Sequence, residues 1–207
     1  MNPYKDSEVL RITGEFYRKF YNDPHPRHLI MAINPGRFGA GVTGIPFTDT
    51  ERLEKVCGIK HNLSSTHEPS SVFVYEMIKT YGGTHAFYRD FYITSVCPLG
   101  FVKENEKGKE VNFNYYDSRE LEKTVTPFII QNLERQLQFS LEKDKCICWG
   151  RGKNFRFLSG LNAKYKFFKE IIPLDHPRFI MQYKANERKE YINQYLRTLQ
   201  EVVLKVI

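Results

Sequence analysis

The spacing of hydrophobic residues changes along this chain, and the change separates strands from helices. Short uninterrupted apolar runs bounded by polar or turn-forming residues have the length expected of buried β-strands. They lie at residues 29–33, 91–96, 145–149 and 170–174. The sequence therefore predicts four short strands, each separated from the next by a longer segment.

The segments between these runs carry apolar residues at helical spacing. The first helix should begin at a cap on Asp6 or Ser7 and end near Tyr21, before two prolines. A capping-box pattern from Thr48 to Glu51 opens a short second helix. Further helices are expected at residues 70–81, 118–141, 154–161 and 185–204, with Pro127 kinking or dividing the second of these four. The polar, Asn-rich stretch 103–117 is expected to be an inserted loop or hairpin.

Strands that alternate with helices indicate a parallel sheet covered on both faces. We therefore predict a single α/β domain over residues 1–207, folded as a three-layer α/β/α sandwich around a central, mainly parallel four-stranded sheet. In sheets of this kind, ligands bind where loops leave the carboxyl ends of the strands. The loops after the predicted strands are thus the first place to search for a site.

Composition narrows the class of protein. With 27% charged and 14% aromatic residues among 207, neither a disordered protein nor a coiled coil is expected. The apolar run at 29–33 is far shorter than the roughly 18 residues of a membrane helix. The first ten residues lack the apolar core of a secretory signal. We expect a cytoplasmic, monomeric protein without a membrane partner.

The four cysteines do not suggest a metal site. Cys57 and Cys97 are isolated, while Cys146 and Cys148 share one face of a predicted strand because side chains alternate with period two. Structural zinc sites use cysteine pairs with two to four residues between them, whereas one residue separates Cys146 from Cys148, and iron–sulfur sites use longer series. We expect buried, reduced thiols, no metal and no cofactor.

Positive charge is concentrated in the last third of the chain. Residues 145–197 hold twelve Lys or Arg and four acidic residues, although the whole chain has a net charge of only +7. A basic region interleaved with aromatic residues suits a polyphosphate partner such as nucleic acid. The same pattern also fits solvated helix faces, so charge alone leaves both interpretations open.

The loop after the first predicted strand carries the clearest motif. Residues 34–47 read NPGRFGAGVTGIPF, with four glycines that allow close approach of the backbone to a ligand. The loop has neither the Gly-Lys-Ser/Thr of a P-loop nor the GxGxxG of a dinucleotide site. It resembles the first motif of the single-strand-selective monofunctional (SMUG) branch of the uracil-DNA glycosylases. The matching positions, in one ungapped stretch, are Asn34, Pro35, Gly36, Phe38, Gly39, Thr43, Gly44, Pro46 and Phe47.

Two further segments agree with this resemblance in order and spacing. Cys97-Pro98-Leu99 is similar to the family's Cys-Pro-Leu, and Asp175-His176-Pro177 is similar to the start of its second motif. The turn at residues 149–152 resembles the family's strand-to-helix glycine turn. The insert at 103–117 has no counterpart that we can assign.

The resemblance implies roles for individual residues. Asn34 would orient a water near the sugar, and His176 would donate a hydrogen bond to the base oxygen as the base departs. Phe47 would stack on a base flipped out of the DNA. The other residues implied in the base pocket are Ile33, Gly36, Phe38, Ala40 and Ser95.

Departures from the family pattern affect base selection. Ser95 stands where the family has a base-reading Asn, and Ala40 stands where it has Met. A serine hydroxyl is shorter than an amide and offers one rotating donor. We therefore expect a roomier pocket that accepts uracil and also a deaminated purine such as xanthine or hypoxanthine.

A third departure follows His176. The family continues Ser-Pro-Arg-Asn after its His-Pro, whereas this chain has Arg178, Phe179, Ile180 and Met181. We expect a loop whose apolar side chains wedge into the DNA, with Arg178 on a phosphate. The alternative is that these side chains pack against the final helix. Further phosphate contacts are expected from Lys184, Arg188 and Lys189.

Taken together, the motifs predict a monofunctional DNA glycosylase of base-excision repair, acting on damaged single- or double-stranded DNA. No lysine is implied as a Schiff-base nucleophile, so strand cleavage should not accompany base release. Two alternatives stay open. One is a catalytically silent nucleic-acid-binding protein with the same fold, and the other is a hydrolase acting on free nucleosides or nucleotides.

Overall fold

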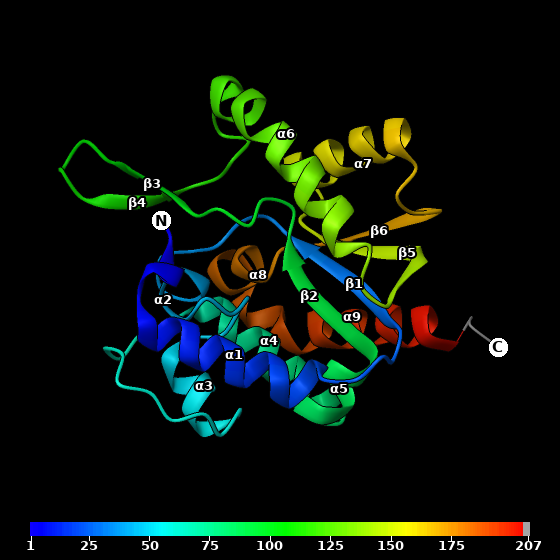
Figure 1. The fold of residues 1–207 in the computed structure, drawn as a ribbon, viewed down its shortest axis with the longest axis horizontal. Coiled ribbons are helices and arrows are strands. Elements are labelled where there is room, and N and C mark those ends of the chain that lie inside the picture. The colour runs from blue at the N-terminus through cyan, green and yellow to red at the C-terminus, as the bar shows by residue number, and fades with distance from the viewer. Residues whose placement is uncertain (205–207) are drawn as a thin grey trace.

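A parallel four-stranded sheet forms the centre of the computed structural model, which describes residues 1–204 (Figure 1). Its strand order is β2-β1-β5-β6, and all three neighbouring pairs are parallel. The strands are β1 (Arg27–Ala32), β2 (Phe91–Ser95), β5 (Leu141–Trp149) and β6 (Glu170–Leu174). The predicted three-layer α/β/α fold with a parallel four-stranded sheet is confirmed.

Helices cover both faces of this sheet. The element bounds are α1 (Ser7–Tyr21), α2 (Ala40–Thr43), α3 (Thr50–Lys55), α4 (Pro69–Tyr81), α5 (Thr84–Asp90), α6 (Arg119–Gln136), α7 (Lys153–Tyr165), α8 (Pro177–Tyr183) and α9 (Arg188–Val203), with 3₁₀ turns at Pro3–Lys5 and Ala185–Glu187. Figure 1 shows α6 and α7 on one side of the sheet and α1, α4, α5 and α9 on the other. None of the helices within residues 1–204 combines the length and hydropathy that crossing a membrane requires.

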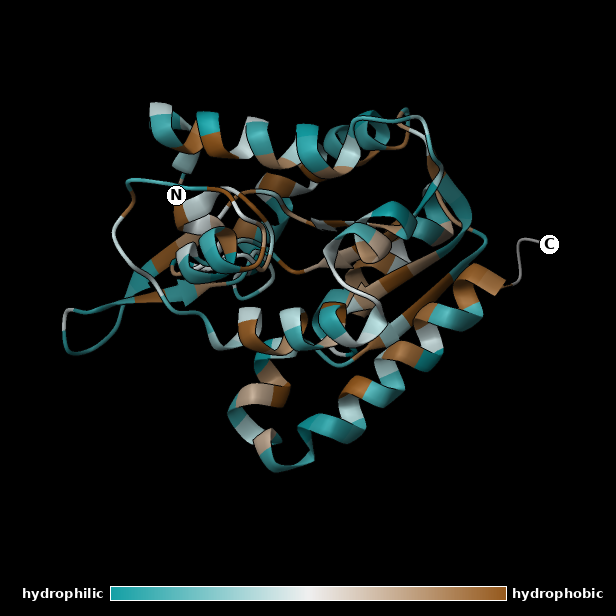
Figure 2. Ribbon diagram, turned by 90° about the horizontal axis from the view of Figure 1, so that it is seen from below, coloured by the Kyte–Doolittle hydropathy of each residue, from teal (hydrophilic) through white to brown (hydrophobic). Residues whose placement is uncertain are grey.

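The alternation of side chains along the strands divides the core into two clusters. Leu29 and Met31 of β1 face α6 and α7, whereas Ile30 and Ala32 of the same strand face α1, α4, α5 and α9. All four are buried. Figure 2 shows hydrophobic residues along the strands and alternating hydrophobic and hydrophilic stripes on the helices. Strand segments with both faces covered are mainly apolar, which explains the short continuous apolar runs.

The cysteines lie in this core. All four are free and buried, and Cys146 and Cys148 share one face of β5 as their spacing predicts. Burial raises the pKa of Cys57 and Cys97 to about 11, which keeps both as uncharged thiols near neutral pH.

The polar insert forms a projecting β-hairpin. Strands β3 (Phe101–Glu104) and β4 (Glu110–Phe113) pair antiparallel and extend from the body of the molecule beside the N-terminus (Figure 1). The hairpin interpretation is thereby confirmed. The following helix, α6, runs through Pro127 without dividing and ends at Gln136, five residues before the expected end.

The segment after His176 differs from its prediction. It is a helix, α8, rather than a loop, because Pro177 sits at its first turn, where a missing N–H costs nothing, and His176 caps it. Ile180 is 0% exposed in the core, and Met181 is half-buried against the same core. The prediction that Ile180 enters the DNA is therefore wrong, and Met181 also packs inward. Phe179, on the outer face, is 41% exposed.

Ile180→Ala should lower the free energy of unfolding by about 3 kcal/mol, since it removes a fully buried side chain and leaves a cavity. Phe179→Ala, one position away on the outer face, should cost less than about 1 kcal/mol. Urea denaturation measures both. Similar small losses for the two variants would contradict the inward orientation of Ile180.

Candidate active site

A cavity of about 600 Å³ opens where β1, β2, β5 and β6 end. Its walls come from the glycine loop after β1, the starts of α4 and α8, the turn after β5 and the base of the β3–β4 hairpin. The sequence-predicted site residues that line it are Ile33, Asn34, Gly36, Ala40, Phe47, Ser95, His176, Arg178 and Phe179. Segments more than 140 residues apart in sequence thus form one site.

The carboxamide of Asn34 is held by the segment that follows β4. Asn34 Oδ1 accepts a hydrogen bond from the Tyr115 N–H at 3.2 Å, and Asn34 Nδ2 donates to the Phe113 carbonyl at 3.4 Å. A backbone donor on one side and a backbone acceptor on the other define which end of the amide is oxygen. Oδ1 keeps a second lone pair with which it can orient a water molecule.

His176 is fixed in one tautomer by its place at the start of α8. Its Nδ1 accepts a hydrogen bond from the Arg178 N–H at 3.1 Å, so in the neutral ring the proton sits on Nε2. Burial, aided by the nearby positive charge of Arg178, lowers the pKa of His176 to about 3. The ring is therefore a neutral donor near pH 7.

Phe47 is held in an unusual backbone conformation beside this ring. Its φ of +52° lies in the left-handed region, which bulky residues rarely adopt. The ring packs edge-on against Trp149 at 5.0 Å between centroids and lies 5.6 Å from His176. A hydrogen bond of 2.6 Å from Thr43 Oγ1 to the Thr48 carbonyl closes the loop around it. Strain of this kind is often retained where a side chain must face a ligand.

The glycine loop packs too tightly for side chains. The Gly41 N–H donates to the Gly36 carbonyl at 2.8 Å, and a Cβ on Gly41 would lie 2.7 Å from that oxygen. Ala40, just before Gly41, is buried and, like Ser95, lines the cavity. Small residues at these positions leave space in the cavity rather than filling it.

Other predicted residues lie away from the cavity. Phe38 is 47% exposed beneath the guanidinium of Arg37, at 4.4 Å, so its prediction as a wall of the base pocket is wrong. Lys184 pairs with Glu187 at 2.8 Å and Arg188 with Glu76 at 3.0 Å. Lys189 is exposed at the start of α9.

The hairpin contributes residues that sequence motifs did not identify. Asn112, Asn114, Tyr116 and Asp117 line the cavity, and Asn112 Oδ1 accepts from the Arg37 N–H at 3.1 Å. The only sequence signal for them is the abundance of Asn in the insert. The site residues missed elsewhere include Glu68, Ser70, Arg151, Lys153, Asp175, Gln182 and Tyr183.

Charged groups are placed around the cavity wall. Arg151 lies 3.3 Å from Asp175, and Lys153 lies 3.9 Å from Asp117, while Arg178 is exposed. Within residues 1–204, no three His, Cys, Asp or Glu side chains are grouped so that they could hold a metal ion. Hydrogen-bonding groups, an aromatic ring and charged side chains of both signs therefore line the cavity.

Comparison with known proteins identifies the class. The sequence model of the uracil DNA glycosylase superfamily matches residues 18–200, which is most of the chain. The chain therefore belongs to the uracil DNA glycosylase superfamily. Among solved structures it is similar to wild-type SMUG2 of Pedobacter heparinus, with 53% identity and a TM-score of 0.94 over 98% of this chain and 87% of that one. The resemblance to the SMUG branch is thereby confirmed. No curated protein sequence matches the chain.

Nuclear magnetic resonance should find His176 neutral, with its proton on Nε2, at pH 5. An unperturbed histidine, with a pKa near 6.5, would be mostly charged there. In the unfolded chain His176 binds a second ring proton below pH 6.5, whereas in the native protein it does not. His176 therefore lowers the free energy of unfolding as pH falls from about 6.5 towards 3. A ring that titrates near 6.5, or a proton on Nδ1, would contradict the assigned tautomer.

Proposed function

We propose that this protein is a monofunctional DNA glycosylase that hydrolyses the N-glycosidic bond of uracil in DNA after the base has flipped into the cavity. The observation that carries the proposal is that Asn34 and His176, each fixed by a backbone N–H, line the same cavity. Membership of the superfamily and similarity to P. heparinus SMUG2 support this assignment. A volume of about 600 Å³ is ample for a nucleobase and part of its sugar.

In the proposed reaction, Asn34 Oδ1 orients a water towards the sugar carbon that loses the base. An amide is a poor proton acceptor, so this arrangement suits a route in which the glycosidic bond breaks largely before water adds. Positioning of the water then matters more than activation of it. The Tyr115 and Phe113 backbone contacts supply that positioning by holding the amide in one orientation.

His176 stabilises the departing base in this scheme. Its Nε2–H donates to a base oxygen on which negative charge develops as the bond breaks. A neutral donor gives this hydrogen bond without having to lose a proton, and the lowered pKa keeps the ring neutral. Phe47, beside His176, provides an aromatic face on which the base stacks.

We extend the proposal to deaminated purines. Ser95 and Ala40 both line the cavity with short side chains, which leaves room for xanthine or hypoxanthine. A serine hydroxyl rotates and can act as donor or acceptor, so it distinguishes bases less strictly than an amide does.

We also propose that base release occurs without strand cleavage. Lysines that form Schiff bases are typically desolvated in apolar pockets. Lys153, the lysine that lines the cavity, has a side chain 58% exposed and lies 3.9 Å from Asp117. The cytoplasmic location, the monomeric state and the single-domain organisation stay predictions.

Asn34→Ala and His176→Ala should each lower the rate of uracil release by about a hundredfold or more, since each removes a positioned group that acts on the transition state. Labelled oligonucleotides carrying uracil, xanthine, hypoxanthine or thymine, single- and double-stranded, are incubated and treated with alkali, and the breaks are scored. Omitting alkali tests for strand cleavage by the protein itself.

Binding of the same oligonucleotides, measured over a range of salt, is the control. Salt-sensitive binding without release of any base would favour a catalytically silent DNA-binding protein. Weak DNA binding together with cleavage of free nucleosides would favour a nucleoside hydrolase. Release of uracil but of neither purine would contradict the proposed widening of the pocket.

Phe179→Ala should reduce activity on duplex DNA by about tenfold and leave activity on single strands within about twofold. Phe179 is exposed at the cavity mouth, where an apolar side chain can fill the space that a flipped base leaves. Phe128→Ala, at an equally exposed phenylalanine on α6, is the matched control. Equal losses on the two substrates would show that Phe179 is no wedge.

A further inference from the structure

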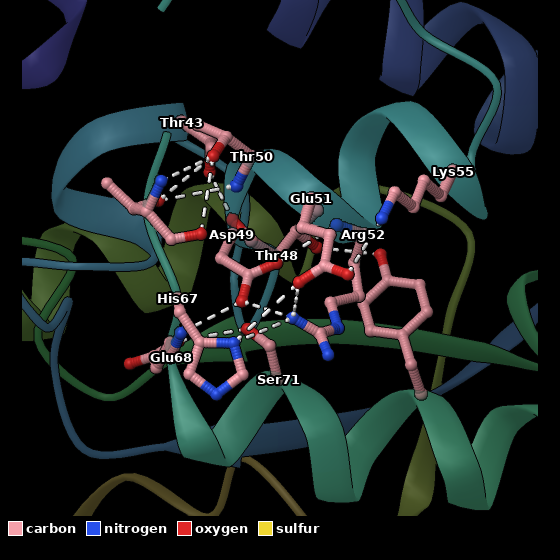
Figure 3. Close-up of polar contacts among 12 residues, drawn as sticks. Thr43, Thr48, Asp49, Thr50, Glu51, Arg52, Lys55, His67, Glu68 and Ser71 are labelled. Atoms are coloured by element: carbon pink, nitrogen blue, oxygen red, sulfur yellow. Dashed lines mark hydrogen bonds and ion pairs between the residues drawn. The ribbon is translucent and has the colours of Figure 1, made fainter. Parts of the chain in front are cut away.

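Glu68 is a carboxyl group in the cavity wall to which the proposed reaction assigns no role. It is the N-cap residue of α4 and lines the same cavity as Asn34 and His176. No family motif in the sequence includes it. Figure 3 shows Glu68 among the polar contacts that join the starts of α3 and α4.

Two hydrogen bonds hold Glu68 in place. Its backbone N–H donates to Asp49 Oδ2 at 2.8 Å, and Ser71 Oγ donates to Glu68 Oε2 at 3.2 Å (Figure 3). Asp49 is fully buried and is itself held by Arg52, 3.0 Å away. Among residues 1–204, Oε1 of Glu68 has no hydrogen-bond partner, so that oxygen is available to a ligand.

The carboxyl group lies against the loop that follows Asn34. A Cβ placed on Gly36 would lie 3.1 Å from Glu68 Oε1, and a Cβ placed on Gly39 would overlap the carboxyl group. The lack of side chains at these two positions is what gives Glu68 access to the cavity. Glu68 therefore lies against the glycine loop that directly follows Asn34 and lines the same cavity.

Its surroundings favour the uncharged form. Burial raises the pKa of Glu68 to about 7, and the Asp49 carboxylate acts in the same direction. These effects outweigh the hydrogen bond from Ser71 and the positive charge of Arg178, which both lower the pKa of Glu68. The charged groups that face it are Asp49 with its partner Arg52 on α3 and Arg178 on α8, and the hairpin side chain near Gly36 is the neutral Asn112. Phosphates of bound DNA would add negative charge and favour protonation further.

We propose that Glu68 binds the flipped nucleotide as a protonated carboxyl, donating a hydrogen bond from Oε1 to an acceptor oxygen of that nucleotide. This inference rests on the proposed glycosylase function and names a further substrate-binding residue for it. A protonated carboxyl offers one donor and one acceptor, as an amide does. It therefore presents a donor and an acceptor on two separate oxygens, whereas the Ser95 hydroxyl carries both on one oxygen.

The test compares wild type with Glu68→Gln and Glu68→Ala. Glu54→Gln, which changes an exposed glutamate on α3, is the charge-matched control. Uracil release is measured as kcat/KM between pH 5.5 and 9. Wild type should lose activity above pH 7, by up to about tenfold per pH unit, because one proton is lost. Glu68→Gln should keep activity across this range, whereas Glu68→Ala should lose about tenfold at pH 6, where wild type has the donor.

Two controls separate Glu68 from its neighbours. His67, 3.2 Å from Arg52, is the adjacent titratable side chain, and His67→Asn should leave the pH profile unchanged. Urea denaturation of Glu68→Gln and Glu68→Ala checks that both are folded.

Two outcomes would overturn the proposal. Wild-type activity that rises through pH 7 and is lost in Glu68→Gln would make Glu68 a charged proton acceptor. Superimposable pH profiles of wild type and Glu68→Gln would give Glu68 no role.

If wild type releases no base at all, the glycosylase function itself fails. Binding of the uracil oligonucleotide over the same pH range then tests Glu68 alone. Wild type should bind it more weakly above pH 7, whereas binding by Glu68→Gln should not change.

Two substrate sets identify the acceptor oxygen. If the acceptor is a base carbonyl, the loss of activity in Glu68→Ala should differ between uracil, xanthine and hypoxanthine. If the acceptor is a phosphate, the loss of activity should be equal for all bases. A methylphosphonate beside the damaged nucleotide should then remove the difference in activity between wild type and Glu68→Ala.

Discussion

Two backbone N–H groups, from Tyr115 and Arg178, hold the two side chains on which the proposed reaction depends. The first donates to Asn34 Oδ1 and the second to His176 Nδ1, and both side chains line the cavity. Backbone donors in packed elements move less than flexible side chains do. The polar groups are therefore oriented before substrate arrives, and little reorganisation is needed as charge develops.

This arrangement makes the inserted hairpin part of the site. Tyr115 follows β4 and is fully buried, and its hydroxyl donates to Asn154 Oδ1 at 2.9 Å. Asn154, near the start of α7, in turn donates to the Trp149 carbonyl at the end of β5. The hairpin base is thus anchored to the carboxyl edge of the sheet, 81 residues in sequence from the Asn34 that it orients.

Local patterns in the sequence account for the sheet and most helices, and the resemblance to a known motif accounts for Asn34, Phe47 and His176. They could not reveal Glu68 or Tyr115, because the contacts that place these residues in the site join segments far apart in sequence. The segment of α8 was misassigned for a related reason. A seven-residue helix is too short to show a period, so nothing local marked Ile180 as inward and Phe179 as outward.

Burial in the cavity wall has opposite effects on the pKa of His176 and of Glu68, and both effects favour the neutral form. It lowers the pKa of His176 and raises that of Glu68, since in each case desolvation disfavours the charged state. Charged side chains such as Arg178 and Lys153 lie further out, where water still reaches them. Attraction of the DNA backbone and recognition of the base are thereby assigned to different groups. Salt should weaken the attraction of the DNA backbone, whereas recognition of the base depends on the hydrogen bonds of neutral donors inside the cavity.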